Sequence, residues 1–420
     1  MNLKITSTMM TMMFLLSALA GCTGGDEAVD LDDSDGGYDY ASNVDNHRML
    51  MGDVCDIKDL SGAYDWDGVM DIYADGKYAE KSDGSYRTLM GFADASGKNH
   101  AYDDYYGADG SWNDFVSAAI EGTGPFAGES DTVRDQATEK GIQNGVMTAY
   151  AIHELNAAII KAEAGNWGPD DAQHAWDEGW AFYHGPDDAD ADYDGCGPFA
   201  TAAKRGGNFG TGDATNIATL AAMNDGLTAL KNEDMQGVID ARDEVLKNVV
   251  IVYSQASVRY ASKMTVDLDE ANGDYDKHQA EGHAFFRVIE AYVADHTDAC
   301  YNNQTHGMAY IGAGEAAHCD GFSWVESPST GEMVCYNMGA GHMVYAAATT
   351  EEICDGFASV FPESGMPGYY ADYGASKIVE IFDLKNDGDT DADYEAHVRM
   401  YLQPVWDAFG ITADDIGTLQ

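Results

Sequence analysis

The chain of 420 residues is poor in basic residues, with 22 Lys and Arg against 73 Asp and Glu and a formal net charge of −51. Such a polyanion is repelled by nucleic acid phosphates and by anionic lipid headgroups, which excludes both as main partners. The chain is not a disordered acidic tail, because 45% of its residues are hydrophobic and 11% are aromatic. This composition suffices for one large core or two smaller ones.

Proline is also scarce, at 8 residues, and beyond residue 21 no stretch approaches the roughly 20 apolar residues that span a bilayer. Apolar residues instead recur every three or four positions, as in Ile142, Val146 and Ala149. Because this is the period of a helix, we predict a mainly α fold. We expect an internally duplicated helical bundle with loop-rich, disulfide-containing insertions.

The N-terminus has the pattern of an export signal. Lys4, an apolar stretch from Met9 to Leu16, and the sequence Leu19-Ala20-Gly21-Cys22 indicate a signal peptide over residues 1–21 that ends in a lipobox. In bacterial lipoproteins of this pattern the cysteine is lipidated, so we expect a membrane anchor on Cys22. The residue after the cysteine is Thr23 and not Asp, which resembles Gram-negative lipoproteins of the outer membrane. The alternative to a lipobox is an ordinary secretory signal with a chance cysteine. The acidic, Gly-rich residues 22–48 are expected to form a flexible tether.

Six cysteines remain after Cys22. In an oxidising compartment they predict up to three disulfides, whose connectivity the sequence leaves open. They are Cys55, Cys196, Cys300, Cys319, Cys335 and Cys354. Because four of them lie between residues 300 and 354, we expect a Cys-rich insert over 297–370 to be held by its own bridges.

Two segments of the chain match each other. Asn144 corresponds to Asn248 (248 − 144 = 104), and Glu178 corresponds to Glu281 (281 − 178 = 103), within a shared Glu-Gly-x-Ala-Phe motif. We predict a single domain over 49–420 with repeats at about 135–200 and 238–296. Two copies packed about an approximate two-fold axis would bury their Phe faces together, whereas chance similarity between amphipathic helices is the alternative.

Each repeat places a carboxylate beside a buried ring. Glu178 precedes Phe182 by four residues, so both lie on one helix face, and Glu281 and Phe285 are spaced alike. A carboxylate next to the core needs a partner. His174 lies one turn before Glu178, a spacing that lets an imidazole and a carboxylate bind one metal ion.

The preceding helices add further candidates, and the two halves would bring them together if they face each other. The predicted metal ligands, some of them in a supporting role, are His153, Glu154, His174, Asp177, Glu178, Tyr260, His278 and Glu281. Tyr260 would donate a phenolate, and Arg259 would hold a small anion. Hard oxygen donors with imidazoles and without thiolates suit Fe³⁺. The alternative is that the two glutamates only hydrogen-bond across the repeat interface.

A second pattern concerns calcium. Asp190, Asp192, Asp194 and Gly195 match the first half of a calcium loop, but Thr201 stands where the bidentate glutamate is needed. We favour an ordinary acidic turn, with a weak Ca²⁺ site as the alternative.

Several of these segments resemble a known family. Ala172–Tyr183, which contains Trp-Asp-Glu-Gly-x-Ala-Phe-Tyr, Ala203–Thr211, Ser257–Ala261 and Ala280–Phe285 are similar to the low-iron-inducible periplasmic proteins of algae, which include the phytotransferrins. The resemblance implies surface capture of ferric iron, with carbonate as an accompanying anion and an iron-uptake transporter or receptor as partner. Our own prediction is an iron-binding protein without catalytic turnover.

Two other functions remain open. One is an imelysin-like surface metalloprotein, because His278-Gln279-Ala280-Glu281 echoes a His-x-x-Glu motif. The other is a structural envelope lipoprotein whose acidic loops bind Ca²⁺.

Overall fold

The computed structural model describes residues 31–98, 100–187 and 195–420. This part is mainly helical, as predicted, and its sheets are small. The signal peptide, Cys22 and the calcium-loop residues Asp190, Asp192 and Asp194 lie outside the described residues. Within the described ranges, no helix combines the length and the apolar character that crossing a bilayer requires.

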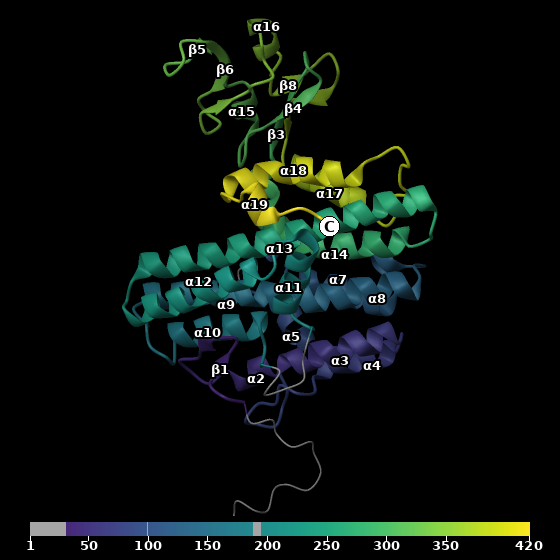
Figure 1. The fold of residues 1–420 in the computed structure, drawn as a ribbon, viewed down its shortest axis with the longest axis vertical. Helices are drawn as coiled ribbons and strands as arrows, with labels where there is room; N and C mark the ends of the chain where they lie inside the picture. The colour runs from purple at the N-terminus through teal and green to yellow at the C-terminus, as the bar shows by residue number, and fades with distance from the viewer. Residues whose placement is uncertain (1–30, 99, 188–194) are drawn as a thin grey trace, which may run out of the picture.

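Two helix pairs form the centre of the molecule (Figure 1). In the first pair, α8 (Asp131–Lys140), the π-helical turn η2 (Gly141–Val146) and α9 (Met147–Glu163) follow without a break, and α10 (Ala172–Tyr183) packs on α9. In the second pair, α13 (Met235–Glu270) packs on α14 (Tyr275–Val293). Each pair is thus a long helix followed by a shorter one, which is the order that the duplication predicts.

The glycine of the shared motif permits close packing of α10 against α9 and of α14 against Phe382. A Cβ atom on Gly179 would lie 2.7 Å from Leu155 Cδ2 on α9, and one on Gly282 would lie 2.1 Å from Phe382 Cε1. Real Cβ atoms do not approach so closely. A glycine directly after Glu178 or Glu281 therefore lets each short helix lie flush against its neighbour.

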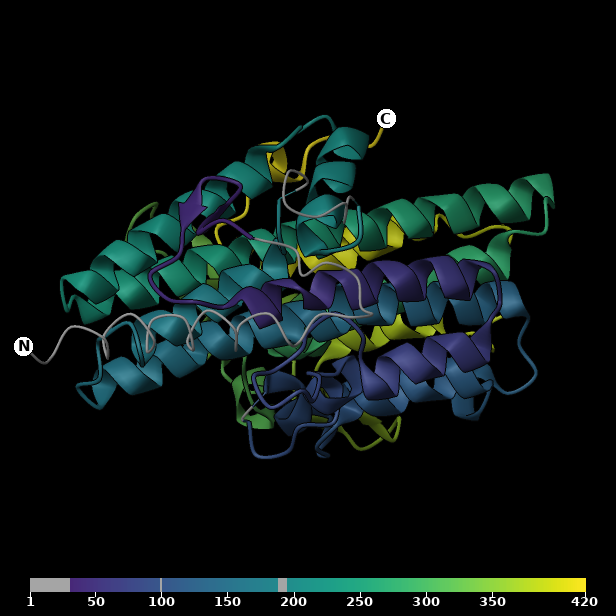
Figure 2. The ribbon, with the colours of Figure 1, turned by 90° about the horizontal axis from the view of Figure 1, so that it is seen from below.

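Other helices surround these pairs. Figure 2 shows the purple N-terminal helices running lengthwise along the bundle. The surrounding helices are α3 (Leu50–Gly62), α4 (Trp66–Asp75), α5 (Leu89–Ala93), α6 (Ala101–Tyr106), α7 (Ser111–Glu121), η1 (Gly124–Phe126), α11 (Pro198–Phe209), α12 (Ala214–Lys231), η3 (Ala294–Thr297), α17 (Tyr373–Phe382), α18 (Tyr394–Ala408) and α19 (Ala413–Ile416).

The N-terminal segment is folded where we expected a tether. β1 (Ser34–Asp35) and β2 (Tyr38–Asp39) form an antiparallel hairpin, followed by α2 (Asp45–Arg48). Gly36 and Gly37 supply the positive φ angles of the turn. Tyr38 and Arg48 are buried, and Arg48 Nε lies 2.7 Å from Asp35 Oδ2. The prediction of a tether over 22–48 is therefore wrong for residues 34–48, because an aromatic anchor and a buried ion pair attach them to the bundle.

The Cys-rich insert has its own small core, and it projects from one end of the molecule (Figure 1). Disulfides Cys300–Cys319 and Cys335–Cys354 lie within it, which confirms the predicted internal bridges. The third bridge, Cys55–Cys196, joins α3 to the segment before α11. The elements of the insert are β3 (Ala299–Asn302), β4 (Gly307–Tyr310), α15 (Ala316–Cys319), β5 (Phe322–Glu326), β6 (Met333–Asn337), β7 (Met343–Val344), α16 (Glu351–Cys354), β8 (Val360–Phe361), β9 (Met366–Pro367) and β10 (Tyr369–Tyr370).

The insert is built from antiparallel pairs. Its two larger sheets have the strand orders β10-β3-β4 and β5-β6-β7, and β8 pairs with β9. The register of β5 and β6 sets Trp324 opposite Cys335. These strands are short, so the bridges supply much of what a larger hydrophobic core would otherwise provide.

Candidate metal centre

Glu178 on α10 accepts contacts from two histidines. Its Oε1 lies 3.1 Å from Nε2 of His174 and 3.2 Å from Nε2 of His47. His174 reaches it because it stands one turn earlier on the same helix face, as predicted. His47 comes from α2, which the N-terminal hairpin brings against α10. The side chain of Glu178 is only 12% exposed, so these contacts form at the edge of the core.

Glu154 on α9 completes a pair of carboxyl groups. It shares a hydrogen bond with Glu178, and His153 Nε2 lies 3.8 Å from its Oε1. Burial and the charge of Glu178 raise the pKa of Glu154. Burial also disfavours ionisation of Glu178, but hydrogen bonds from His174 and Glu154 outweigh it and lower its pKa. The pair therefore shares one proton, which a bound cation would displace.

Two of the imidazoles are in the protonation state that metals bind. Burial lowers the pKa of His47 and of His153 to about 4, so both rings are neutral at neutral pH. Neutral imidazole is the form that binds metals. The hydrogen bond of His174 to Glu178 raises the pKa of this ring, against the opposing effect of burial.

Asp177 supports the centre without facing it. Its carboxylate accepts hydrogen bonds from the Tyr38 hydroxyl at 2.6 Å, from the backbone N–H groups of Ala41 and Ser42 at 2.9 and 2.8 Å, and from the Ser42 hydroxyl at 2.7 Å. Because Ser42 donates to Asp177, its Oγ accepts from His174 Nδ1 at 2.8 Å. This series of hydrogen bonds places the proton of His174 on Nδ1 and directs its Nε2 toward Glu178.

The centre opens into a cleft of about 620 Å³. His47, His153, Glu154 and Glu178 line it, together with the ring of Tyr150. Its other lining residues include four cations, Lys81, Arg87, Lys98 and Lys161. The cleft therefore combines metal-ligand chemistry with positive charge that can hold an anion next to a bound cation.

The predicted residues of the second repeat lie in another cluster. His278 Nδ1 lies 2.5 Å from Asp267 Oδ2 and its Nε2 lies 3.0 Å from Lys263 Nζ, so neither ring nitrogen is free for a metal. Burial and the charge of Glu281 raise the pKa of Tyr260, which disfavours the phenolate that we predicted.

The two motif carboxylates thus have different surroundings. The neighbours of Glu178 are His47, His174 and Glu154. The charge of Glu281 instead acts on the pKa of Arg259, Tyr260 and Lys263. In Figure 1, α10 and α14 lie on opposite sides of the helical body. The described residues thus form two clusters where we expected one pocket, and Arg259 belongs to the second.

The aromatic rings follow the same division. Phe182 packs against Phe92 and Tyr150 beside His47, whereas Phe285 stacks on Tyr260. Both phenylalanines are buried, as predicted, but within one core they contact different sets of rings.

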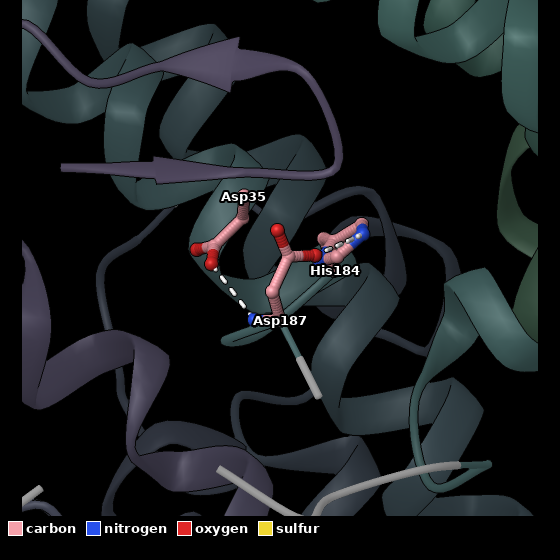
Figure 3. A group of neighbouring side chains, drawn as sticks. All are labelled: Asp35, His184 and Asp187. Carbon is pink, nitrogen blue, oxygen red and sulfur yellow. Dashed lines mark hydrogen bonds and ion pairs between the residues drawn. The ribbon is translucent and has the colours of Figure 1, made fainter. Parts of the chain in front are cut away.

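A further acidic group has the composition of a metal site. Figure 3 shows Asp35, with the Asp187 backbone N–H donating to it, and the Asp187 side chain turned toward His184. Asp35 also accepts two hydrogen bonds from Arg48, both at 2.7 Å, and one from Tyr40 at 2.6 Å. Its acceptor positions are thus filled and a guanidinium lies beside it. We therefore assign this group to holding the N-terminal hairpin.

Sequence reasoning missed His47 and the four cations of the cleft. His47 stands far from the matched motifs and belongs to no repeat, and it lies in a segment that we expected to be a tether. The only local signal is that Tyr38 and Arg48 stand among acidic residues, and this pattern alone does not distinguish an ordered hairpin from a tether.

Comparison with protein families assigns the chain to a family. A family model described as "Low iron-inducible periplasmic protein" matches residues 12–286. The chain belongs to this family. The match includes α2, the first helix pair and most of the second, so it contains every side chain of the metal centre. Comparison with curated proteins and with solved structures gave no match. The insert and the helices after it lie outside the matched range.

Proposed function

We propose that this member of the low iron-inducible periplasmic family captures ferric iron at the Glu178 centre and delivers it to an uptake transporter or receptor, without catalytic turnover. The observation that carries the proposal is the partly buried Glu154–Glu178 pair flanked by His47, His153 and His174 at an open cleft. Membership in the family supplies the link to iron.

The donor set suits a hard or borderline cation. Carboxylate oxygens and imidazole nitrogens form the sites of non-haem iron proteins. Thiolates would favour softer metals, but the six described cysteines are all in disulfides. The proton that the two glutamates share marks a place where positive charge is required, and Fe³⁺ would supply it.

The cations of the cleft support an accompanying anion. Arg87 is close enough to His47 to contribute to its lowered pKa, and its Nε donates to Asn46 Oδ1 at 2.7 Å. Its remaining guanidinium nitrogens are suited to a carboxylate-like ligand such as carbonate. In this proposal Arg87 takes the role that the sequence gave to Arg259.

We propose that the protein works at the outer membrane, attached through a lipid on Cys22. The lipobox supports this placement, and the net charge of −51 makes direct adhesion to anionic lipids unfavourable. Labelling expressing cells with a radioactive fatty acid should label the wild type and leave Cys22→Ser unlabelled. Equal labelling would reject the anchor.

Ferric binding is tested on protein that begins at residue 22. After incubation with ferric citrate and desalting, elemental analysis should find stoichiometric iron in the wild type and almost none in Glu178→Gln. The matched control is Glu281→Gln, which alters the corresponding carboxylate of the other repeat and should load fully. Circular dichroism confirms that each variant is folded.

Several outcomes would reject the proposal. Full loading of Glu178→Gln would remove the centre from iron binding, and equal loss in both variants would point to the single shared pocket. Zn²⁺ or Ca²⁺ retained in preference to iron would assign another metal. The imelysin-like alternative receives less support, because its motif residue His278 has both ring nitrogens engaged.

A further inference from the structure

A group of basic side chains gathers in the second repeat. Arg205 comes from α11, Arg259 and Lys263 come from α13, and Glu281 comes from α14. We call these four residues, with Tyr260, the Arg205 cluster. The guanidinium of Arg205 lies 5.6 Å and the ammonium of Lys263 lies 5.3 Å from the centre of the Tyr260 ring.

The charges of this cluster do not balance. Only 22 of the 420 residues are Lys or Arg, yet three of them, Arg205, Arg259 and Lys263, lie close together here. The charge of Arg205 acts on the pKa of Arg259 and Lys263, and so does that of Glu281. Burial lowers the pKa of Lys263, and the positive charges of Arg259, Lys277 and Arg205 lower it further, against the opposing charge of Glu281. Tyr260 shares hydrogen bonds with Arg205, Arg259 and Glu281, but it adds no negative charge, because burial and the charge of Glu281 raise the pKa of its hydroxyl.

Several donors of the cluster have no acceptor. Among the described residues, Nε and Nη1 of Arg205 and Nε of Arg259 are buried without a hydrogen-bond partner. Arg205 is only 7% exposed, so water cannot solvate most of its guanidinium. Buried charged donors without acceptors are costly, and a bound anion would relieve that cost. Arg259 and Lys263 are partly exposed, which gives such an anion a route from solvent.

Glu281 adds a requirement of its own. Its Oε2 is buried without a hydrogen-bond partner, and its nearest basic contact is His278 Nε2 at 3.9 Å. A carboxylate only accepts hydrogen bonds, so it would repel an anion that carries no proton. An anion with an O–H group would donate that proton to Glu281 and accept from the two arginines.

We propose that the Arg205 cluster binds a small oxyanion that carries a proton, of the hydrogen phosphate or hydrogen carbonate class. The three cations would bind its negative oxygens, and Glu281 would accept its O–H. This site is separate from the Glu178 centre and does not depend on bound iron. In this proposal, the two repeats would bind ligands of opposite charge.

Calorimetric titration tests this proposal on iron-free protein that begins at residue 22. The probes are inorganic phosphate, sodium bicarbonate and sodium sulfate, each at matched ionic strength in chloride buffer. Phosphate or bicarbonate should bind, whichever is the natural ligand, and sulfate should bind at least about tenfold more weakly because it has no proton for Glu281. Arg205→Gln should weaken phosphate or bicarbonate binding by about tenfold or more.

Two variants separate recognition from structural support. Glu281→Gln replaces the acceptor by an amide that can donate, so it should bind sulfate as tightly as phosphate. Arg399→Gln alters an arginine paired with Glu395 on α18 and should bind as the wild type does. In chloride alone, Arg205→Gln should be at least as stable as the wild type, because a buried charge with two unsatisfied donors is removed.

Three results would overturn the proposal. The wild type could bind sulfate as tightly as phosphate and bicarbonate, or it could bind none of the probes. Arg205→Gln and Arg399→Gln could also weaken the affinity for phosphate or bicarbonate equally. Glu178→Gln should keep the oxyanion affinity of the wild type. A failure of ferric loading would therefore leave this result unaffected, and a failure here would leave the ferric proposal unaffected.

Discussion

His47 Nε2 lies 3.2 Å from Glu178 Oε1, and this contact joins the N-terminal helix α2 to α10 of the first repeat. The proposed metal centre is therefore completed by a segment outside both repeats. Its integrity depends on the hairpin that precedes α2, in which Tyr38 and the backbone of Ala41 are bound by Asp177.

The first prediction distinguishes the histidine that the structure adds from one that the sequence suggested. His47→Gln should weaken ferric binding by about tenfold or more, because it removes a neutral nitrogen ligand. His278→Gln should leave the affinity unchanged, because that ring is held between Asp267 and Lys263. Competition against a chelator of known affinity measures both. Equal weakening in the two variants would contradict the assignment.

The second prediction concerns Ser42, which positions His174 without reaching the cleft. Ser42→Ala removes the acceptor of the Nδ1 proton of His174. Ferric affinity should fall by roughly 10- to 100-fold, as is usual when the partner of a metal-binding imidazole is lost. Ser376→Ala removes a surface hydroxyl that donates to the Tyr373 carbonyl and serves as the control. An unchanged affinity in Ser42→Ala would show that His174 needs no such support.

The third prediction follows from the proton that Glu154 shares with Glu178. Because burial and Glu178 raise the pKa of Glu154, iron must displace its proton at neutral pH. Iron loading at a fixed ferric citrate concentration should therefore increase between about pH 6 and about pH 8. Glu154→Gln has no proton to lose and should show a smaller increase in the same solutions. Identical pH profiles would contradict the shared proton.

Local patterns in the sequence predicted much of the architecture. The spacing of Ile142, Val146 and Ala149 predicted the helical fold, and the crowding of four cysteines predicted an insert with its own bridges. These features depend on neighbours close in sequence, and a periodic pattern records them directly.

The composition of the site was less accessible. Glu178 and His174 are one turn apart, so their proximity was predictable, whereas His47 reaches them only because Asp177 holds the N-terminal hairpin. Arg205 comes from α11, which has no counterpart in the matched repeats, so nothing indicated that basic side chains would gather near Glu281. The matching motifs predicted that Glu178 and Glu281 have similar surroundings. Two elements outside the matched segments, α2 and α11, make these surroundings different.

The fourth prediction concerns the insert. Replacing Cys335 and Cys354 by serine removes a bridge across 19 residues, which typically contributes about 3 kcal/mol. Because the insert has its own core, the loss should stay local. Limited proteolysis should cut the insert faster, while iron loading remains that of the wild type. Replacing Cys55 and Cys196 should instead lower the thermal stability of the helical body, which that bridge crosses. Loss of iron loading in the insert variant would show that the two parts are coupled.

The last prediction concerns stability in acid, and it rests on His283 of α14. Burial, with the charge of Arg287, lowers the pKa of His283 from 6.5 to about 4, and its ring packs 5.5 Å from that of Phe115. The folded state thus binds the proton more weakly than the unfolded state. The contribution is complete above pH 6.5 and is lost as the pH falls toward 4, with a limit of about 3 kcal/mol.

Urea unfolding at about pH 7 and about pH 4.5 measures this contribution. In His283→Gln the free energy of unfolding should fall less between the two values than in the wild type, because the unfolded state loses one proton-binding site. Some pH dependence should remain, since burial also lowers the pKa of His47, His100 and His153. The exposed His342→Gln should keep the full dependence. If His283→Gln lost as much stability as the wild type, the ring would be protonated in the folded protein, and its position against Phe115 would have to be maintained in the charged form.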